Sequence, residues 1–155
     1  MPKESNELKA VKKEISDSFY GRKNKMNFII IAPVPKEKIV GKNAGKIYDS
    51  FYEKIIKAKL SEITIFNGAG TYTTKDKQEL FQSVYFLIGK DITEEHAKKF
   101  LKETGTESVI FNNKIIYDDG TEKTFSKAVF SKNNTFNGDS TTLIIYGEML
   151  SFQFI

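Results

Sequence analysis

The spacing of apolar side chains near the start of the chain predicts an amphipathic helix over residues 5–20. These side chains recur every three or four positions, at Leu8, Val11, Ile15 and Phe19. Ser5 suits the N-cap position, and Gly21 suits the helix end. We expect this helix to pack on the domain. The alternative is an arm that docks on a second subunit or a target, because partner helices use the same spacing.

Hydrophobic period and turn chemistry predict six elements between residues 26 and 111, in the order strand, helix, strand, strand, helix, strand. The segments are 27–32, 47–58, 63–66, 79–88, 93–105 and 108–111. The first is almost wholly apolar, which predicts a strand covered on both faces. The first helix carries a wide apolar stripe and should be widely buried. This order implies the α+β class, with a ferredoxin-like βαββαβ core at 26–111.

The last third of the chain, residues 112–155, is expected to extend this core with further β-structure. Strands are predicted at 114–117, around 124–130 and over 142–155, with an Asp119-Gly120 turn and a polar loop at 132–140. No repeat or low-complexity linker separates this part from the rest, and 155 residues suit one domain. We therefore expect a single domain over 1–155.

The two central strands of the predicted core are apolar on both faces, although the two helices can cover only one face. The other face would expose a larger apolar patch than monomers usually tolerate. We expect it to be covered by the C-terminal β-structure, the N-terminal helix or a second copy of the chain, in that order. An open RNA-binding face is disfavoured, because segment 81–86 lacks the glycine and the basic residue of an RNA-recognition motif.

Composition narrows the chemistry that the chain can perform. The chain has no cysteine, which fits a reducing compartment and excludes thiol catalysis and zinc-thiolate sites. His96, the one histidine, is expected to be an exposed helix residue, and Asp118-Asp119-Gly120 has the composition of a turn and lacks the further ligands of a calcium loop. We predict no catalytic residue, no metal site and no cofactor.

The net charge of +4 is compatible with nucleic-acid binding, but Arg22 is the only arginine among the 24 basic residues. Arginine is the usual residue for bidentate recognition of phosphate and guanine, so sequence-specific base reading is disfavoured. If the chain binds a nucleotide or a nucleic-acid backbone, we expect two surfaces to take part. They are a basic cluster and a Gly-rich segment after the second strand: Arg22, Lys23 and Lys25; Gly68, Gly70, Tyr72, Thr73, Lys75 and Lys77.

The Gly-rich segment does not match a known phosphate loop. Its spacing would place the third glycine of the dinucleotide fingerprint at Thr73, and no Gly-Lys-Ser/Thr ending follows. The simpler expectation is a β-bulge or a loop over residues 67–70, with a positive φ at one glycine.

No apolar run is long enough to cross a bilayer, and no signal-peptide core follows the Lys-rich start. We expect a cytoplasmic protein without a membrane partner.

Part of the chain resembles a group of small uncharacterised bacterial and phage proteins with a ferredoxin-like fold. The matching pieces are 60–65, 70–72, 79–84 and 107–110, about a third of the chain. The shared motifs are structural, so the resemblance implies the fold and transfers no active site.

Three functions fit these observations. The first is a non-enzymatic binding protein, such as a phage or mobile-element inhibitor or accessory factor, that acts through a protein–protein surface and forms a homo-oligomer. The alternatives are a module that sequesters a nucleotide or nucleic acid, and a ferredoxin-like dimeric enzyme of unknown reaction that depends on Tyr72 or His96.

Overall fold

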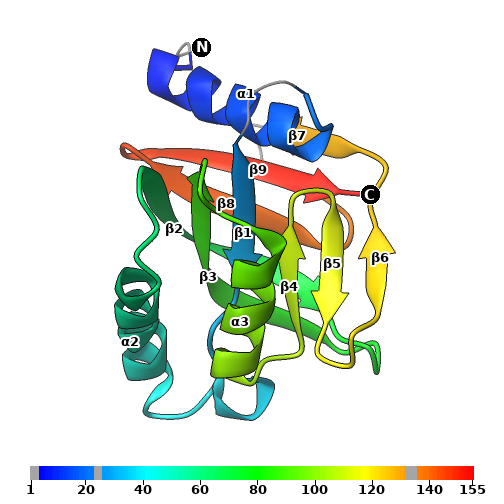
Figure 1. The fold of residues 1–155 in the computed structure, drawn as a ribbon. Coiled ribbons are helices and arrows are strands. Elements are labelled where there is room, and N and C mark those ends of the chain that lie inside the picture. Colours follow the sequence, from blue (N-terminus) through cyan, green and yellow to red (C-terminus); the bar gives the residue numbers. More distant parts are fainter. Residues whose placement is uncertain (1–3, 23–25, 132–135) are drawn as a thin grey trace.

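One curled antiparallel sheet of nine strands forms the framework of the molecule (Figure 1). The computed structural model describes residues 4–22, 26–131 and 136–155. The strand order is β6-β5-β4-β1-β3-β2-β8-β9-β7. The strands are β1 (Asn27–Ile31), β2 (Ile63–Thr73), β3 (Glu79–Gly89), β4 (Ser108–Phe111), β5 (Lys114–Tyr117), β6 (Glu122–Thr124), β7 (Ala128–Ser131), β8 (Ser140–Ile145) and β9 (Glu148–Phe154). The helices of the described residues are α1 (Asn6–Phe19), α2 (Ala44–Lys57), α3 (Glu94–Thr104) and a short 3-10 turn, η1 (Lys36–Lys38).

The predicted fold class, a small ferredoxin-like βαββαβ core with a β extension, is wrong. Strands β4, β1, β3 and β2 do lie in the middle of the sheet, but neither β4 nor β2 is an edge. Strand β4 also pairs with β5, and β2 also pairs with β8, so the C-terminal third continues the sheet on both sides. The pattern predicted a strand at each of these four places, although only residues 63–66 of β2, and it did not show that β2 and β4 accept further neighbours.

Helix α1 and the C-terminal strands cover the inner face of the sheet. Ser5 caps α1, because its Oγ accepts a hydrogen bond from the Leu8 amide at 3.1 Å. The apolar stripe of α1 enters a core with β1, β3, β8 and β9: Leu8, Val11, Ile15, Phe19, Phe28, Phe86, Leu143 and Phe152. Figure 1 places α1 at the end of the sheet where β1 begins. The chain itself therefore covers the second face of the central strands.

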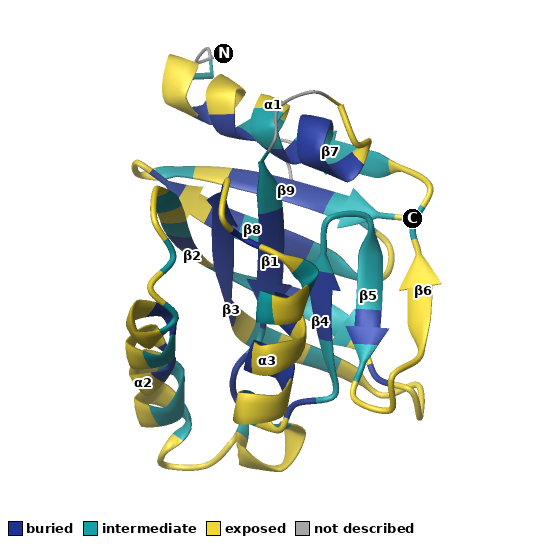
Figure 2. Ribbon diagram, viewed as in Figure 1, coloured by how far each residue is buried: buried dark blue, intermediate teal, exposed yellow. Residues whose placement is uncertain are grey.

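Helices α2 and α3 pack on the outer face, where β1, β3 and β4 present the other half of their side chains. Strand β1 contributes Ile29 and Ile31 there, and both are fully buried. Figure 2 shows this burial along β1 and β3, in contrast to β6, which is exposed throughout. The wide buried stripe predicted for α2 is wrong. Of its residues only Phe51 and Ile55 are buried, since no described element packs against the far side of this helix.

Three predicted segments also change. The expected strand around 124–130 is two strands, β6 and β7, which lie at opposite edges of the sheet because residues 125–127 leave the ladder between them. The expected loop at 67–70 is the middle of the continuous strand β2, which pairs along its full length with β3. The expected strand at 142–155 is a hairpin, in which Tyr146 and Gly147 make the turn with φ of 48° and 82°. Residues 132–135 of the predicted polar loop lie outside the described residues.

In the described part of the chain, no helix combines the length and the hydropathy needed to cross a membrane.

Candidate functional site

The two predicted basic surfaces lie at opposite ends of the sheet. Arg22 precedes β1, and its guanidinium pairs with the Asp17 carboxylate at 3.3 Å. Lys75 and Lys77 lie in the turn between β2 and β3, at the end of β3 that begins with Glu79. Strand β1 begins at the other end of β3, where Asn27 pairs with Gly89. Eleven residues of strand separate the two ends, roughly 35 Å. Lys23 and Lys25 are outside the described residues. The structure therefore does not bring Arg22 and the β2–β3 turn into one anion site.

Gly68 and Gly70 have a packing role inside β2. They pair with Val84 and Gln82 of β3 on one side, and with Leu143 and Thr141 of β8 on the other. Neither glycine has a positive φ, so the predicted bulge or loop geometry is absent at both. A backbone held between two strands does not offer a row of free amides to an anion.

Lys75 and Lys77 differ in their surroundings. The ammonium of Lys75 lies 2.9 Å from Asp118 and 3.0 Å from Asp119, which raise its pKa through these hydrogen bonds. It also lies 5.5 Å from the centre of the Tyr117 ring. Its charge is thus already compensated. Lys77 is exposed and adopts a left-handed φ of 65° in the turn.

Tyr72 and Thr73 are held by hydrogen bonds to the C-terminal part of the chain. The Tyr72 hydroxyl lies 2.7 Å from Thr141 Oγ1, and burial raises the pKa of Tyr72. Thr73 donates to the Asp139 carboxylate at 2.7 Å. Both residues line a pocket at the end of the sheet farthest from α1.

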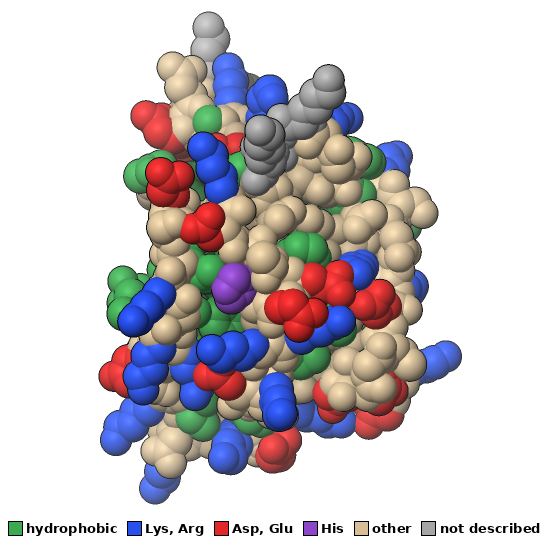
Figure 3. All heavy atoms as spheres, viewed as in Figure 1, with side chains coloured by type: hydrophobic (Ala, Val, Ile, Leu, Met, Phe, Trp, Pro, Cys, Tyr) green, Lys and Arg blue, Asp and Glu red, His purple; other side chains and the backbone are tan. Residues whose placement is uncertain are grey.

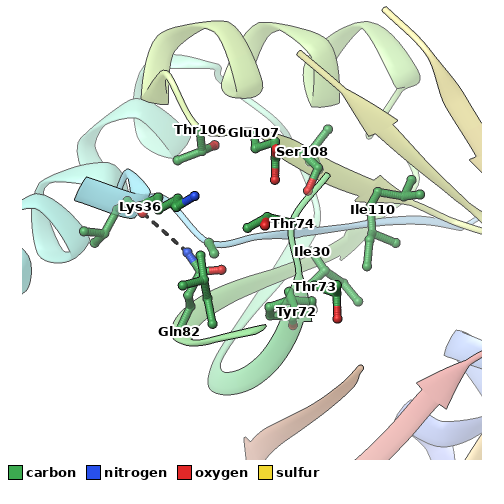
Figure 4. Close-up of a pocket in the computed structure, with 15 residues that line it drawn as sticks. Ile30, Lys36, Tyr72, Thr73, Thr74, Gln82, Thr106, Glu107, Ser108 and Ile110 are labelled. Atoms are coloured by element: carbon green, nitrogen blue, oxygen red, sulfur yellow. Dashed lines mark hydrogen bonds between the residues drawn. The ribbon is translucent and has the colours of Figure 1, made fainter. Parts of the chain in front are cut away.

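This end pocket has a cavity volume of about 60 Å³ (Figure 4). Its floor is apolar and comes from β1, β3, β4 and β5 and the segment after β1: Ile30, Ala32, Val34, Leu80, Val109, Ile110 and Ile115. Its rim is polar: Lys36, Tyr72, Thr73, Thr74, Gln82, Thr106, Glu107 and Ser108. Pockets with an apolar floor and a few convergent polar groups are the usual form of small-molecule sites.

The rim contains two charged side chains, and they have different partners. Lys36 pairs with Asp76 at 3.0 Å. The Glu107 carboxylate accepts hydrogen bonds from the backbone amide of Lys75 at 3.2 and 3.3 Å. Sequence reasoning missed Glu107 as a site residue, because only the fold brings the start of β4 next to the β2–β3 turn.

A second candidate is the uncovered outer face of β2, β3, β8 and β9, beyond the reach of α2 and α3. We call it the bare face. It forms an open groove whose twelve lining residues include no charged one: Tyr48, Asn67, Gly68, Ala69, Gly70, Thr71, Phe81, Ser83, Ser140, Thr142, Ile144 and Met149. Three of its apolar side chains are largely exposed, namely Phe81 at 72%, Ile144 at 51% and Met149 at 69%.

The edge of the bare face is fixed by Tyr48 of α2. Its ring stacks on that of Tyr85 at a centroid distance of 4.4 Å. Its hydroxyl donates to the Val84 carbonyl at 2.7 Å and accepts from the Asn67 amide at 2.7 Å. Burial raises the pKa of Tyr48. These contacts hold the wall of the groove in place.

The face that carries α3 has the ordinary mixed character of a solvated protein surface. Figure 3 shows Lys, Asp and Glu side chains interleaved over the face that carries α3. On that helix, His96 Nδ1 accepts a hydrogen bond from the Thr93 amide at 3.1 Å and completes a capping box. The histidine is therefore part of a helix cap. Within the described residues, no three His, Asp or Glu side chains are grouped so as to hold a metal ion.

Comparisons with known proteins add little to this geometry. No family model and no curated protein matches the sequence. A solved structure of a phage SAM lyase in complex with S-methyl-5'-thioadenosine is similar over 64% of this chain and 88% of that chain, with 16% identity and a TM-score of 0.39. A likeness of this size establishes neither a shared fold nor a shared activity.

Proposed function

We propose that this protein is a non-enzymatic binding protein that recognises a partner protein through the bare face. The observation that supports the proposal is the absence of charge from the twelve residues of that groove, in a chain with 28% charged residues. The centres of protein–protein interfaces are depleted in charge and enriched in aromatic residues and methionine.

The exposure of Phe81, Ile144 and Met149 supports the same proposal. Large apolar side chains gain roughly 25 cal/mol for every Å² removed from water, so their exposure in one groove favours association. The groove floor between them consists of small residues such as Ala69 and Ser83. A partner side chain can therefore reach the sheet without displacing a bulky or charged group.

The partner is expected to present an uncharged, largely apolar segment, since a buried charge would find no counter-ion in the groove. A second copy of this chain is one protein with such a surface. We propose that this interaction takes place in the cytoplasm. We also propose that the protein acts there as a phage or mobile-element inhibitor or accessory factor.

The two alternatives from the sequence have less support from the geometry. A nucleotide or nucleic-acid site would need Arg22 and Lys75 together, but they lie at opposite ends of β3, and Lys75 is paired with two aspartates. An enzyme that uses His96 would need this side chain free, but it caps α3.

Site-specific photo-crosslinking tests the proposal. In the cells that make the protein, a photo-reactive amino acid replaces Ser83 in the bare face. The control variant carries the same amino acid in place of the exposed Lys99 on α3. We expect one discrete adduct from position 83 and none of the same mass from position 99. An adduct between two copies of this chain supports the face as a self-association surface. No adduct from position 83, or the same adduct from both positions, contradicts the proposal.

Matched substitutions then identify the contact. Phe81→Asp is expected to abolish the adduct and to weaken binding of the identified partner at least about tenfold, as for an aromatic hot spot. Val40→Asp makes the same kind of change at an almost fully exposed residue outside the bare face and should leave binding unchanged. Equal effects of the two substitutions would contradict a specific role of this face.

A further inference from the structure

We propose that the end pocket binds a small organic cation, an alkylammonium group with an apolar body, and that Glu107 is its counter-ion. This site lies at the opposite end of the sheet from α1, does not depend on the bare face, and goes beyond the proposed protein–protein function. Its ligand has the opposite charge to the anions that the basic sequence composition suggested.

The first step concerns the space. The curled sheet is filled by α1 and the C-terminal strands at one end, and the cavity of about 60 Å³ remains at the other. A single water needs about 10–15 Å³ of such a volume, so the cavity is larger than one water. It suits a short alkyl chain whose polar end stays at the rim.

The second step concerns polarity. Ile30, Val109 and Ile110 on the floor are all buried and offer no hydrogen bond from their side chains. The lining also has polar residues, among which Figure 4 shows Glu107 and Ser108 beside each other at the start of β4. A ligand that fits both regions has an apolar body and one polar end.

The third step concerns the sign of the charge. The ammonium of Lys36 is paired with Asp76, so the positive charge of the lining is compensated. The Glu107 carboxylate accepts from the Lys75 backbone amide, and it has no ion pair within 4.0 Å among the described residues. The pocket mouth therefore carries one uncompensated negative charge, which attracts a cation and repels carboxylates and phosphates.

The fourth step concerns hydrogen bonds. An ammonium group has three N–H donors and no acceptor. Glu107 and the Ser108 hydroxyl can accept from it, and Thr74, whose neighbour Lys75 donates its amide to Glu107, lies close to them (Figure 4). A neutral alcohol of the same shape would leave the carboxylate without a charged donor, and hydrogen bonds to charged groups contribute more than neutral ones.

An NMR titration of the full chain tests this inference. The probes are n-butylammonium, 1-butanol and butyrate, which share the apolar body and differ in the charge of the polar end. We expect saturable shifts of backbone amides around Thr74 and Glu107, with n-butylammonium binding at least about tenfold more tightly than the other two. A short ligand of this size is expected to have a Kd of about millimolar. No saturable shift at these amides, or equal affinity for the three probes, overturns the inference.

Two variants locate the interaction. Glu107→Gln removes the charge but keeps an oxygen that can accept from the Lys75 amide. This variant should bind n-butylammonium and 1-butanol with about equal affinity. Glu53→Gln makes the same change on the exposed side of α2, away from the pocket, and should keep the preference.

Leu80→Trp keeps the rim charge and fills the cavity, so it should abolish binding of all three probes even if Glu107→Gln does not fold. Binding that survives in Leu80→Trp, or a preference that survives in Glu107→Gln, contradicts the proposed site. The photo-crosslinking result at the bare face is independent of both variants.

Discussion

At the scale of single residues, Gly68 shows how a missing side chain determines the architecture. A Cβ atom at this position would lie 2.2 Å from the Thr142 carbonyl oxygen and 2.9 Å from a methyl group of Leu143. The first of these atoms belongs to the backbone of β8, so the clash cannot be relieved by a rotamer change. Glycine at this position is what allows β8 to pair with β2.

We therefore expect Gly68→Ala to lower the free energy of unfolding by about 1–3 kcal/mol, the usual cost of overpacking. Urea denaturation followed by circular dichroism measures this change. Gly45→Ala on α2 is the control, because nothing lies within 4 Å of its added Cβ. This control should be neutral or stabilise by up to about 1 kcal/mol. A neutral Gly68→Ala would show that β8 does not approach β2 this closely.

The same glycines explain why the sequence was misread at residues 67–70. Two glycines one residue apart usually indicate a loop, because glycine is the residue that accepts a positive φ. Here both have ordinary extended backbone, and the reason for glycine is the neighbouring strand. Since β8 begins about 70 residues later, no local pattern could reveal this reason.

At the scale of elements, α1 is a structural part of the inner core. Ile15 is fully buried, and it packs in one cluster with Phe86 of β3 and Phe152 of β9. This position favours the first of the two interpretations drawn from the sequence, in which the helix packs on its own domain.

Ile15→Ala is accordingly expected to cost about 2–5 kcal/mol of folding free energy, as for other large-to-small core substitutions. The cost should not depend on protein concentration, because the contacts lie within one chain. Lys9→Ala, on the exposed side of the same helix, should change stability by less than about 0.5 kcal/mol. Urea denaturation at two protein concentrations separates this result from that of an arm, whose loss would matter more at high concentration.

The cap of α3 gives a second prediction at this scale. Thr93 Oγ1 accepts from the His96 amide at 3.3 Å, and His96 Nδ1 accepts from the Thr93 backbone amide at 3.1 Å. Thr93→Ala removes the first of these bonds and is expected to destabilise the protein by about 1 kcal/mol. Thermal unfolding should show a lower Tm for this variant, whereas Lys99→Ala, an exposed control in α3, should leave the Tm nearly unchanged.

Elements whose signals are local were predicted well. The Ser5 and Thr93 caps, the Gly105 helix end and the strand at 108–111 all occur where the sequence indicated. The errors lie where the answer depends on a distant segment, as in the hairpin turn at Tyr146 and Gly147 or the neighbours of β2. The same reason explains the site, because Glu107 and Phe81 gain their surroundings only when the sheet curls.

At the scale of the whole molecule, the sheet creates two different surfaces from one framework. Its inner face is filled by α1 and the C-terminal strands, and the end pocket remains at the far end. Its outer face is covered by α2 and α3 over β1 and β4 but stays open over β8 and β9. Among the described residues, α2 and α3 are the helices on the outer face, and they do not extend over β8 and β9, which leaves the bare face uncovered.

Buried and half-buried tyrosines make the stability of the whole molecule sensitive to high pH. Burial raises the pKa of Tyr85 to about 12, and it also raises the pKa of Tyr48 and Tyr72 above the usual value of 10. These groups keep their protons in the folded state at pH values where the unfolded chain has lost them. The stability they contribute is complete below about pH 10 and is lost as the pH rises toward 12.

Tyr85→Phe isolates one part of this effect. The Tyr85 hydroxyl donates to the Tyr48 carbonyl at 2.8 Å, so the variant should be less stable than the wild type at pH 8, by about 1 kcal/mol. Above pH 10 the wild type should lose up to about 1.4 kcal/mol more per pH unit than the variant, which has no proton to release at this position. Urea midpoints at pH 8, 10, 11 and 12 measure the two curves. The two curves should cross at about pH 11, because the stability that the wild type loses by pH 12 exceeds its advantage at pH 8. Parallel curves would mean that Tyr85 ionises in the folded protein as readily as in the unfolded chain.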